Sequence, residues 1–109
     1  MGYYTDFKLK IISNPNSLHE DPVFSRLEEI SGYGGIEEYG GELYEIKWYN
    51  HEEDLILLSK EFPELVFQLD GKGEEDGDIW RKFFKSGKYS SSQAIIIITL
   101  PDYDESKLK

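Results

Sequence analysis

The chain has 109 residues, the length of one domain (1–109) that can bury a core without a metal ion or a disulfide. Aromatic residues make up 15% of the sequence, which excludes intrinsic disorder, and the absence of cysteine excludes disulfides, thiol catalysis and thiolate metal ligands. The net charge of −10 belongs to one region, because the segment 37–78 carries fourteen of the twenty-two carboxylates and only three lysines. Concentrated negative charge repels nucleic acid and attracts basic surfaces or cations, so the sequence points to a partner rather than to a reaction.

The first third of the chain predicts a strand followed by a helix. Apolar and polar residues alternate over 7–11, which is the period of a half-buried strand. Asp21 followed by Pro22 predicts a helix start with Asp21 as the capping residue, and Gly32 is expected to end that helix.

Five of the ten residues in the segment 32–41 are glycine. The segment is either a mobile loop or part of a hairpin in which 36–39 turns at Gly40-Gly41 into a strand over 43–48. We favour the hairpin, because two glycines between β-prone runs are a turn signal.

A second helix is expected after Asn50, which would cap it, with Glu53 completing a capping box and Pro63 ending the helix. Alternating apolar residues over 65–69 predict the next strand.

The C-terminal part predicts an acidic loop over 70–77 and then a strand over 79–84. A tight turn over 85–88 leads into a last strand that includes 94–100, whose four consecutive isoleucines are typical of a central strand. The tail 101–109 is expected to be frayed.

This order predicts an α+β two-layer sandwich, with two helices on one face of a mainly antiparallel sheet. A ferredoxin-like βαββαβ core with an added C-terminal β-hairpin has the same order of elements. We expect Leu27, Leu58, Phe67, Trp80 and Ile96 to be buried.

The sequence shows no catalytic arrangement. Its two histidines, His19 and His51, are expected at the surface, and neither stands near a serine in a nucleophile elbow. The pair Asp76 and Asp78 lies in a loop that is expected to be solvated, where carboxylates are not desolvated enough for acid–base catalysis. We therefore expect that the protein is not an enzyme.

Metal, phosphate and nucleic-acid sites are not expected either. The acidic loop fails the calcium-loop spacing, with Lys72 at its third position and Arg81 at its twelfth, and it lacks the fingerprints of nucleotide-binding loops. The segment 79–89 carries basic and aromatic residues in the pattern of a nucleic-acid surface, but its aromatics are needed for the core. We expect no cofactor, no metal and no direct contact with nucleic acid.

The acidic region is either a solvated surface or a partner-binding surface, and we favour the second interpretation because crowding like charges destabilises a fold. If they prove exposed, Tyr44, Trp48 and Tyr49 are candidate anchors. The candidate partner-binding residues are Glu37, Glu38, Glu42, Glu45, Glu52, Glu53, Asp54, Glu74, Glu75, Asp76 and Asp78.

Several short motifs stand between about 43 and 88: WYNHEED (48–54), LSKEFP (58–63), FQL (67–69), GEEDGDIW (73–80) and the Gly-Lys pair at 87–88. In these motifs the chain resembles small proteins of phages and mobile elements and is distantly similar to the YubB-like ferredoxin-type domains of plasmids and phages. These motifs are structural, so the resemblance implies the fold and transfers no catalytic residue. The acid content departs from the YubB-like pattern.

The resemblance to small acidic phage proteins implies an inhibitor of host defence, such as an anti-CRISPR protein. Such an inhibitor would present carboxylates to the basic nucleic-acid-binding groove of a CRISPR effector or another defence nuclease. An immunity-type or housekeeping domain that binds a basic protein is the alternative. The residues 1–6 do not read as a signal peptide and no apolar run is long enough to span a bilayer, so we expect a cytoplasmic protein of a bacterial host.

Overall fold

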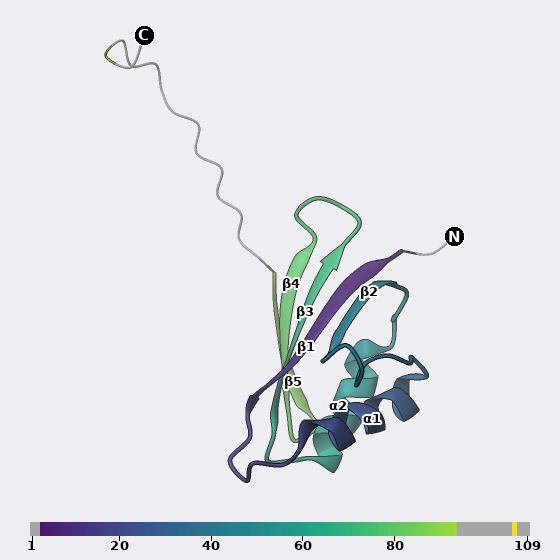
Figure 1. Cartoon of the computed structure of the whole chain (residues 1–109). Helices are drawn as coiled ribbons and strands as arrows, with labels where there is room; N and C mark the ends of the chain where they lie inside the picture. Colours follow the sequence, from purple (N-terminus) through teal and green to yellow (C-terminus); the bar gives the residue numbers. More distant parts are fainter. Residues whose placement is uncertain (1–2, 94–105, 107–109) are drawn as a thin grey trace.

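The computed structural model describes residues 3–93 and residue 106. Within them the chain forms an α+β structure of five strands and two helices, labelled in Figure 1. The elements follow in the order β1 (Thr5–Ser13), α1 (Glu20–Ser31), β2 (Glu42–Ile46), α2 (His51–Glu61), β3 (Val66–Gly73), β4 (Ile79–Lys85) and β5 (Lys88–Gln93).

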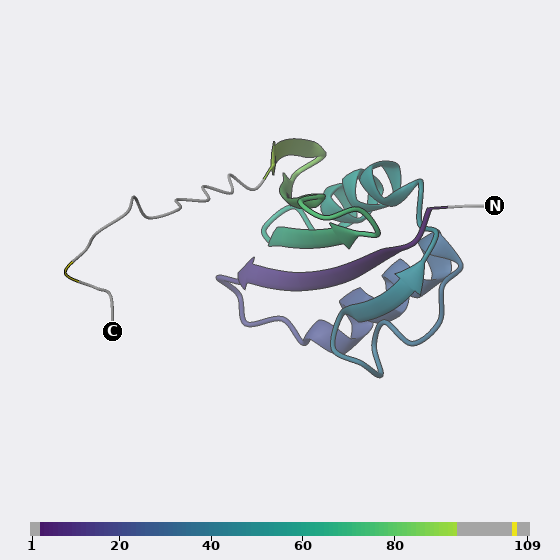
Figure 2. The same ribbon diagram turned by 90° about the horizontal axis from the view of Figure 1, so that it is seen from above.

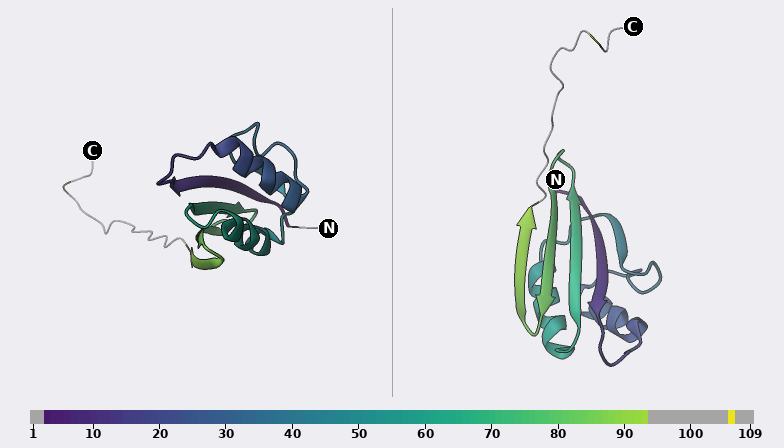
Figure 3. Two further views of the ribbon diagram at one scale, coloured as in Figure 1. Left: turned by 90° about the horizontal axis from the view of Figure 1, so that it is seen from below. Right: turned by 90° about the vertical axis from the view of Figure 1, so that its left-hand side faces the viewer.

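The five strands form one sheet in the order β2-β1-β3-β4-β5, and all neighbouring strands are antiparallel. Figure 2 shows β1 between β2 and β3. In the right-hand view of Figure 3 the strands lie in front of both helices, so the sheet has one covered and one open face. The arrangement is compatible with a ferredoxin-like sandwich.

The core lies between the covered face and the helices. Phe7 and Leu9 of β1 pair with Gly71 and Leu69 of β3, and Phe67 pairs with Phe84 of β4, so alternate residues of three strands point to the helices. Leu27, Leu58 and Phe67 are fully buried, as the sequence predicts. Trp80 is half-buried, because it packs against the rim of the core. Ile96 lies outside the described residues.

The prediction of a hairpin over 36–41 is wrong. These residues form turns, and the strand that follows, β2, pairs with β1. Ile36 turns inward and is buried in the core. Gly41 lies against β1, where the Leu9 amide donates to the Gly41 carbonyl at 2.8 Å and a Cβ at Gly41 would stand 2.4 Å from the Leu9 oxygen. A ferredoxin-like core requires a strand along the outer edge of β2, and this segment does not supply it.

At the two helix starts the expected caps are found only in part. His19 occupies the N-cap position of α1 and Asp21 lies inside its first turn. Asn50 does occupy the N-cap of α2, but its ψ of 21° is not extended and its side chain makes no capping bond. The expected capping box with Glu53 is therefore absent.

β4 begins and ends close to its predicted position, whereas β3 runs beyond its predicted end at residue 69. β3 continues to Gly73, so the acidic loop is the shorter segment 74–78. The chain reverses at Ser86-Gly87, as predicted, and β5 follows β4 as an edge of the described sheet. The central strand expected over 94–100 lies outside the described residues, as does the frayed tail over 101–109 apart from residue 106.

Gly32 ends α1 as the sequence predicts, with a φ of 80° and its amide bonded to the Glu28 carbonyl. A Cβ at Gly32 would meet no atom within 4 Å, so replacement by alanine adds backbone strain and no clash. We expect Gly32→Ala to lower the free energy of unfolding by about 1 kcal/mol. The control is Gly34→Ala, whose φ is not left-handed and whose Cβ would have space. Equal losses from the two variants in urea unfolding would contradict the strain assigned to Gly32.

Candidate functional site

Many of the predicted carboxylates gather where β1 begins. Thr5 pairs with Ile46 at the end of β2 and with Gly73 at the end of β3, so those two strand ends meet there. The start of α2 is close by, because Tyr49 Oη accepts a hydrogen bond from the Tyr3 amide at 2.8 Å. We call this region the acidic end; it comprises Glu45, Glu52, Glu53, Asp54, Glu74, Glu75, Asp76 and Asp78.

The three other predicted residues lie at the opposite end of β2. Glu37 and Glu38 are exposed in the turns that precede β2. Glu42 pairs with Lys8 at 3.3 Å and accepts a hydrogen bond from the Tyr44 hydroxyl at 2.9 Å. That hydroxyl, followed by Lys8, lowers the pKa of Glu42. The structure therefore does not bring these three carboxylates to the acidic end.

The N-terminal segment holds the acidic loop in place. Tyr3 Oη donates to Asp78 Oδ2 at 2.6 Å and accepts from the Glu75 amide at 3.0 Å. The Tyr4 amide donates to Glu74 Oε1 at 2.9 Å. The bond to the Asp78 carboxylate raises the pKa of Tyr3. The loop is thus a tethered structure, and two of its carboxylates already have partners.

Four exposed carboxylates of the acidic end have no side-chain hydrogen bond or ion pair within the described part of the chain: Glu45, Glu53, Glu75 and Asp76. Tyr49, whose hydroxyl accepts from the Tyr3 amide, is 64% exposed beside them. Tyr44, which precedes Glu45 in the chain, is 66% exposed, but its hydroxyl is bonded to Glu42. Trp48, which was a candidate anchor, is in the core. Exposed tyrosines next to unpaired carboxylates are typical of a protein-binding surface.

The structure also contains a polar cluster that the sequence did not predict. Lys82 is only 8% exposed and faces the helices from β4. Its Nζ lies 2.6 Å from Glu52 Oε1, 2.7 Å from His51 Nε2 and 4.4 Å from the centre of the Trp80 ring. We call Lys82, Glu52, His51 and Trp80 the Lys82 cluster. The signal was present in the sequence, because alternation places Lys82 between the inward-facing Trp80 and Phe84.

His51 is therefore not the surface histidine that was expected. Its ring stacks on Trp80 with centroids 5.0 Å apart, and its Nδ1 lies 2.8 Å from the Trp48 carbonyl oxygen. A carbonyl only accepts, so Nδ1 carries the proton and Nε2 accepts from the Lys82 ammonium. Burial, and then the Lys82 charge, lower the pKa of His51. The imidazole is neutral at pH 7.

The Lys82 cluster fastens α2 to the sheet. Every polar group in it has a partner, which leaves no unpaired base or nucleophile. The hydrogen bond from Lys82 lowers the pKa of Glu52. Asp54 is also engaged, since its Oδ2 accepts from Trp48 Nε1 at 2.7 Å. Glu52 and Asp54 of the acidic end thus serve the fold.

Comparison with known proteins found no family model, no curated protein and no solved structure that matches the chain. Within residues 3–93 and 106, no group of three or more histidine or carboxylate side chains is arranged to hold a metal ion. Neither described helix has the length and apolar character needed to cross a membrane.

Proposed function

We propose that the chain is a non-enzymatic binding domain that docks its acidic end on a basic protein surface. The observation that carries this proposal is the set of exposed carboxylates without side-chain partners among the described residues, namely Glu45 of β2, Glu53 of α2, and Glu75 and Asp76 of the loop that Tyr3 tethers, beside the exposed Tyr49. Tethering reduces the entropy lost on binding. The negative field accelerates encounter with a basic partner, and the tyrosine supplies contact area.

The partner that we propose is the basic nucleic-acid-binding groove of a bacterial defence nuclease, such as a CRISPR effector. The carboxylates would take the places of phosphates there, and the protein would act in the cytoplasm of a bacterial host. The resemblance to small acidic phage proteins supports this class of partner. An immunity-type or housekeeping domain that binds another basic protein is the alternative, which the same acidic end supports equally.

The fold that we propose for this domain is a ferredoxin-like core that has lost one strand. The chain order of β1, α1, β2, α2 and β3 supports it, since β2 and β3 run in the same direction on either side of β1. The turns over 36–41 replace the missing strand, and β4 and β5 are the added C-terminal hairpin. An experimental structure with a strand along the outer edge of β2 would contradict the loss.

The binding proposal predicts that neutralising the acidic end weakens capture of the partner. The variant Glu53→Gln, Glu75→Gln, Asp76→Asn removes three charges without removing a side-chain hydrogen bond or ion pair among the described residues. We expect at least about tenfold weaker affinity, mostly through slower association at low salt. Pulldown from a bacterium that carries the defence system, followed by binding kinetics with the captured protein, measures it.

A matched control removes three exposed charges elsewhere, with Glu20→Gln, Asp21→Asn and Glu64→Gln. Equal weakening by the control would show that net charge, not the acidic end, drives binding. Competition with the captured nuclease's guide RNA or target DNA separates the two partner classes. If the captured protein binds its nucleic acid equally well with and without this chain, it is a basic protein of the alternative class.

A further inference from the structure

The open face of the sheet has balanced charges around the cross-strand row of Lys8, Asp70 and Arg81. Lys8 pairs with Glu42 at 3.3 Å, and Arg81 forms two hydrogen bonds with Asp70 at 2.7 and 3.0 Å. Lys8 and Asp70 are themselves cross-strand neighbours. Opposite charges in adjacent strands stabilise the sheet and leave little net field.

The other end of the open face has no such balance. Lys10 stands in a cross-strand row with Gln68, Phe83 and Ser90, and this row contains no acid. At the reversal of the chain Lys85 pairs directly with Lys88, and like charges placed opposite each other destabilise a sheet. Neither lysine has an ion pair within the described part of the chain.

The helix α2 adds a further lysine to this end. The side chain of Lys60 lies against Gly87, where a Cβ would stand 2.8 Å from its Cε. Glu64 is near, because Ser86 Oγ donates to the adjacent Pro63 carbonyl. The local charge therefore stays positive on a protein whose net charge is −10. We call Lys10, Lys60, Lys85, Lys88 and Phe83 the basic end.

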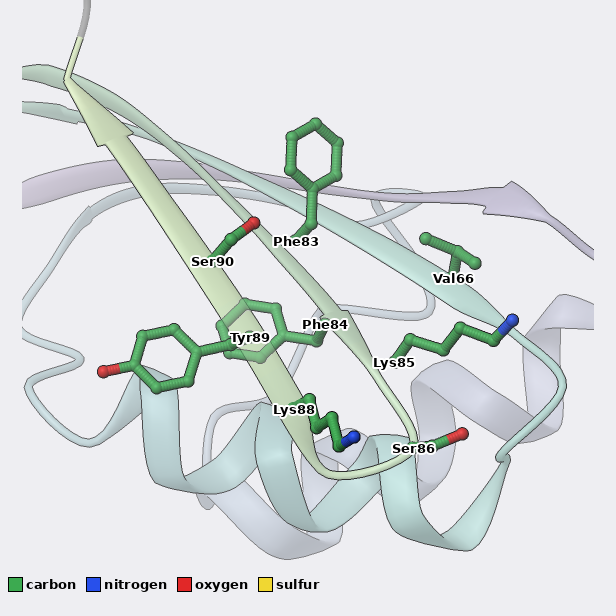
Figure 4. Close-up of a pocket in the computed structure, with 8 residues that line it drawn as sticks. All are labelled: Val66, Phe83, Phe84, Lys85, Ser86, Lys88, Tyr89 and Ser90. Carbon is green, nitrogen blue, oxygen red and sulfur yellow. The ribbon is translucent and has the colours of Figure 1, made fainter.

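A hollow of about 420 Å³ lies at the basic end, lined by Val66, Phe83, Phe84, Lys85, Ser86, Lys88, Tyr89 and Ser90. In Figure 4, Phe83 and Val66 point to the side of the sheet away from the helices, and Lys85 and Lys88 flank the reversal of the chain. An apolar floor with cationic edges suits a carboxylate-rich segment that carries some apolar surface.

The acidic loop (74–78) and the basic end are electrically independent at physiological salt. They lie at opposite ends of the strands, with the β3–β4 loop at one end and the β4–β5 reversal at the other (Figure 1). β1 alone has nine residues, which span about 30 Å. Charges are screened beyond about 8 Å at physiological ionic strength. An anionic group at the basic end is therefore not repelled by Glu75 and Asp76 of the same molecule. Glu52 does lie near the hollow, because the Tyr89 hydroxyl hydrogen-bonds to its carboxylate, but Lys82 compensates its charge.

We propose that the basic end binds the acidic end of a second copy of this chain, in a head-to-tail arrangement. Charge complementarity supports this occupant, since the acidic loop presents Glu75 and Asp76 without internal partners and the basic end presents lysines without them. Shape supports it as well, because the tethered loop projects from one end of the sheet and the hollow lies at the other. The contact is heterologous, so it leaves one free surface of each kind and can repeat.

Self-association goes beyond the proposed function and stands without it. Self-association and binding of the basic partner would both use the acidic end, so a second copy bound there would keep the protein from its partner. The assembly is expected to be strongest near 0.1 M salt and to dissociate at 1 M, where the screening length is about 3 Å. At 0.01 M the screening length reaches about 30 Å, and repulsion between the net charges should weaken association again.

Complementary charge reversal tests the proposal. One variant carries Lys85→Glu and Lys88→Glu, the other Glu75→Lys and Asp76→Lys. Sedimentation velocity of each chain from about 10 μM to 1 mM is expected to show association for the natural sequence and monomers for each variant. A mixture of the two variants is expected to associate, because it contains both the natural contact and its charge-reversed form.

The control is Glu37→Lys with Glu38→Lys, which changes the net charge as much as the acidic-end variant but lies outside both ends. It is expected to associate like the natural sequence. Circular dichroism of each variant verifies that it is folded. A natural chain that stays monomeric at 1 mM in 0.1 M salt overturns the proposal, as does a mixture of variants that does not associate. If partner capture fails while the natural chain still self-associates, the result contradicts the proposed function and leaves the self-association proposal intact.

Discussion

Glu52→Ala is expected to lower the free energy of unfolding by about 2 kcal/mol, because it leaves the Lys82 ammonium nearly buried without its carboxylate. The Lys82 side chain is 10% exposed, whereas that of Glu52 is 38% exposed, so the loss should be smaller than for a fully buried pair. Glu53→Ala is the control. Both residues lie in the first turn of α2 and interact alike with the helix dipole, but Glu53 is exposed and has no side-chain hydrogen bond or ion pair with any described residue. The control should cost about 0.5 kcal/mol.

A double-mutant cycle isolates the contact. Lys82→Met keeps a long side chain in the same space and removes the charge that Glu52 compensates. Once Lys82 is replaced, Glu52→Ala should cost no more than the Glu53→Ala control, which gives a coupling energy of about 1.5 kcal/mol. Urea unfolding of the four chains at pH 7 measures it. Additive losses would mean that the Lys82 cluster does not fasten α2 to the sheet.

Elements with local signals were predictable from the sequence. The alternation over 7–11 gives β1, Gly32 ends α1 by its left-handed conformation, and Pro63 follows the end of α2. The turns over 36–41 were not predictable, because their cause is tertiary. Ile36 is buried against elements that are distant in sequence, and Gly41 fits a backbone approach to Leu9 that no local pattern encodes.

The candidate site was predictable in its charge and not in its geometry. Composition identifies the acidic segment, but Tyr3 determines which loop carboxylates are engaged, from a position 75 residues away from Asp78. The Lys82 cluster joins residues 30 positions apart, and only the packing of α2 on β4 brings them together. The charge of the basic end is likewise a product of strand register, since the sequence spreads its lysines over β1, α2, β4 and β5.

Acidification below about pH 6.5 is expected to destabilise the protein through His51. The ordinary pKa of 6.5 applies to the unfolded chain, and burial followed by the Lys82 charge lowers the pKa of His51 in the folded state. Between these two values the unfolded state binds more protons, so stability falls as the pH falls. The slope is at most about 1.4 kcal/mol per pH unit for one proton. The groups that face His51 are Lys82 from β4 and, on its own helix, Glu52 and Asp54.

The pH range of this loss of stability distinguishes His51 from the carboxylates. Glu52 has its pKa lowered from 4.5 by Lys82, so its contribution to stability is complete above about pH 4.5 and is lost only as the pH falls further. Urea unfolding of His51→Gln between pH 7.5 and 5 should therefore show a smaller slope than the natural chain, and a lower stability at pH 7.5 from the lost stacking on Trp80. The control His19→Gln, at an exposed position before α1, should keep the natural slope. A slope that persists in His51→Gln and vanishes in His19→Gln would contradict the buried, neutral imidazole beside Lys82.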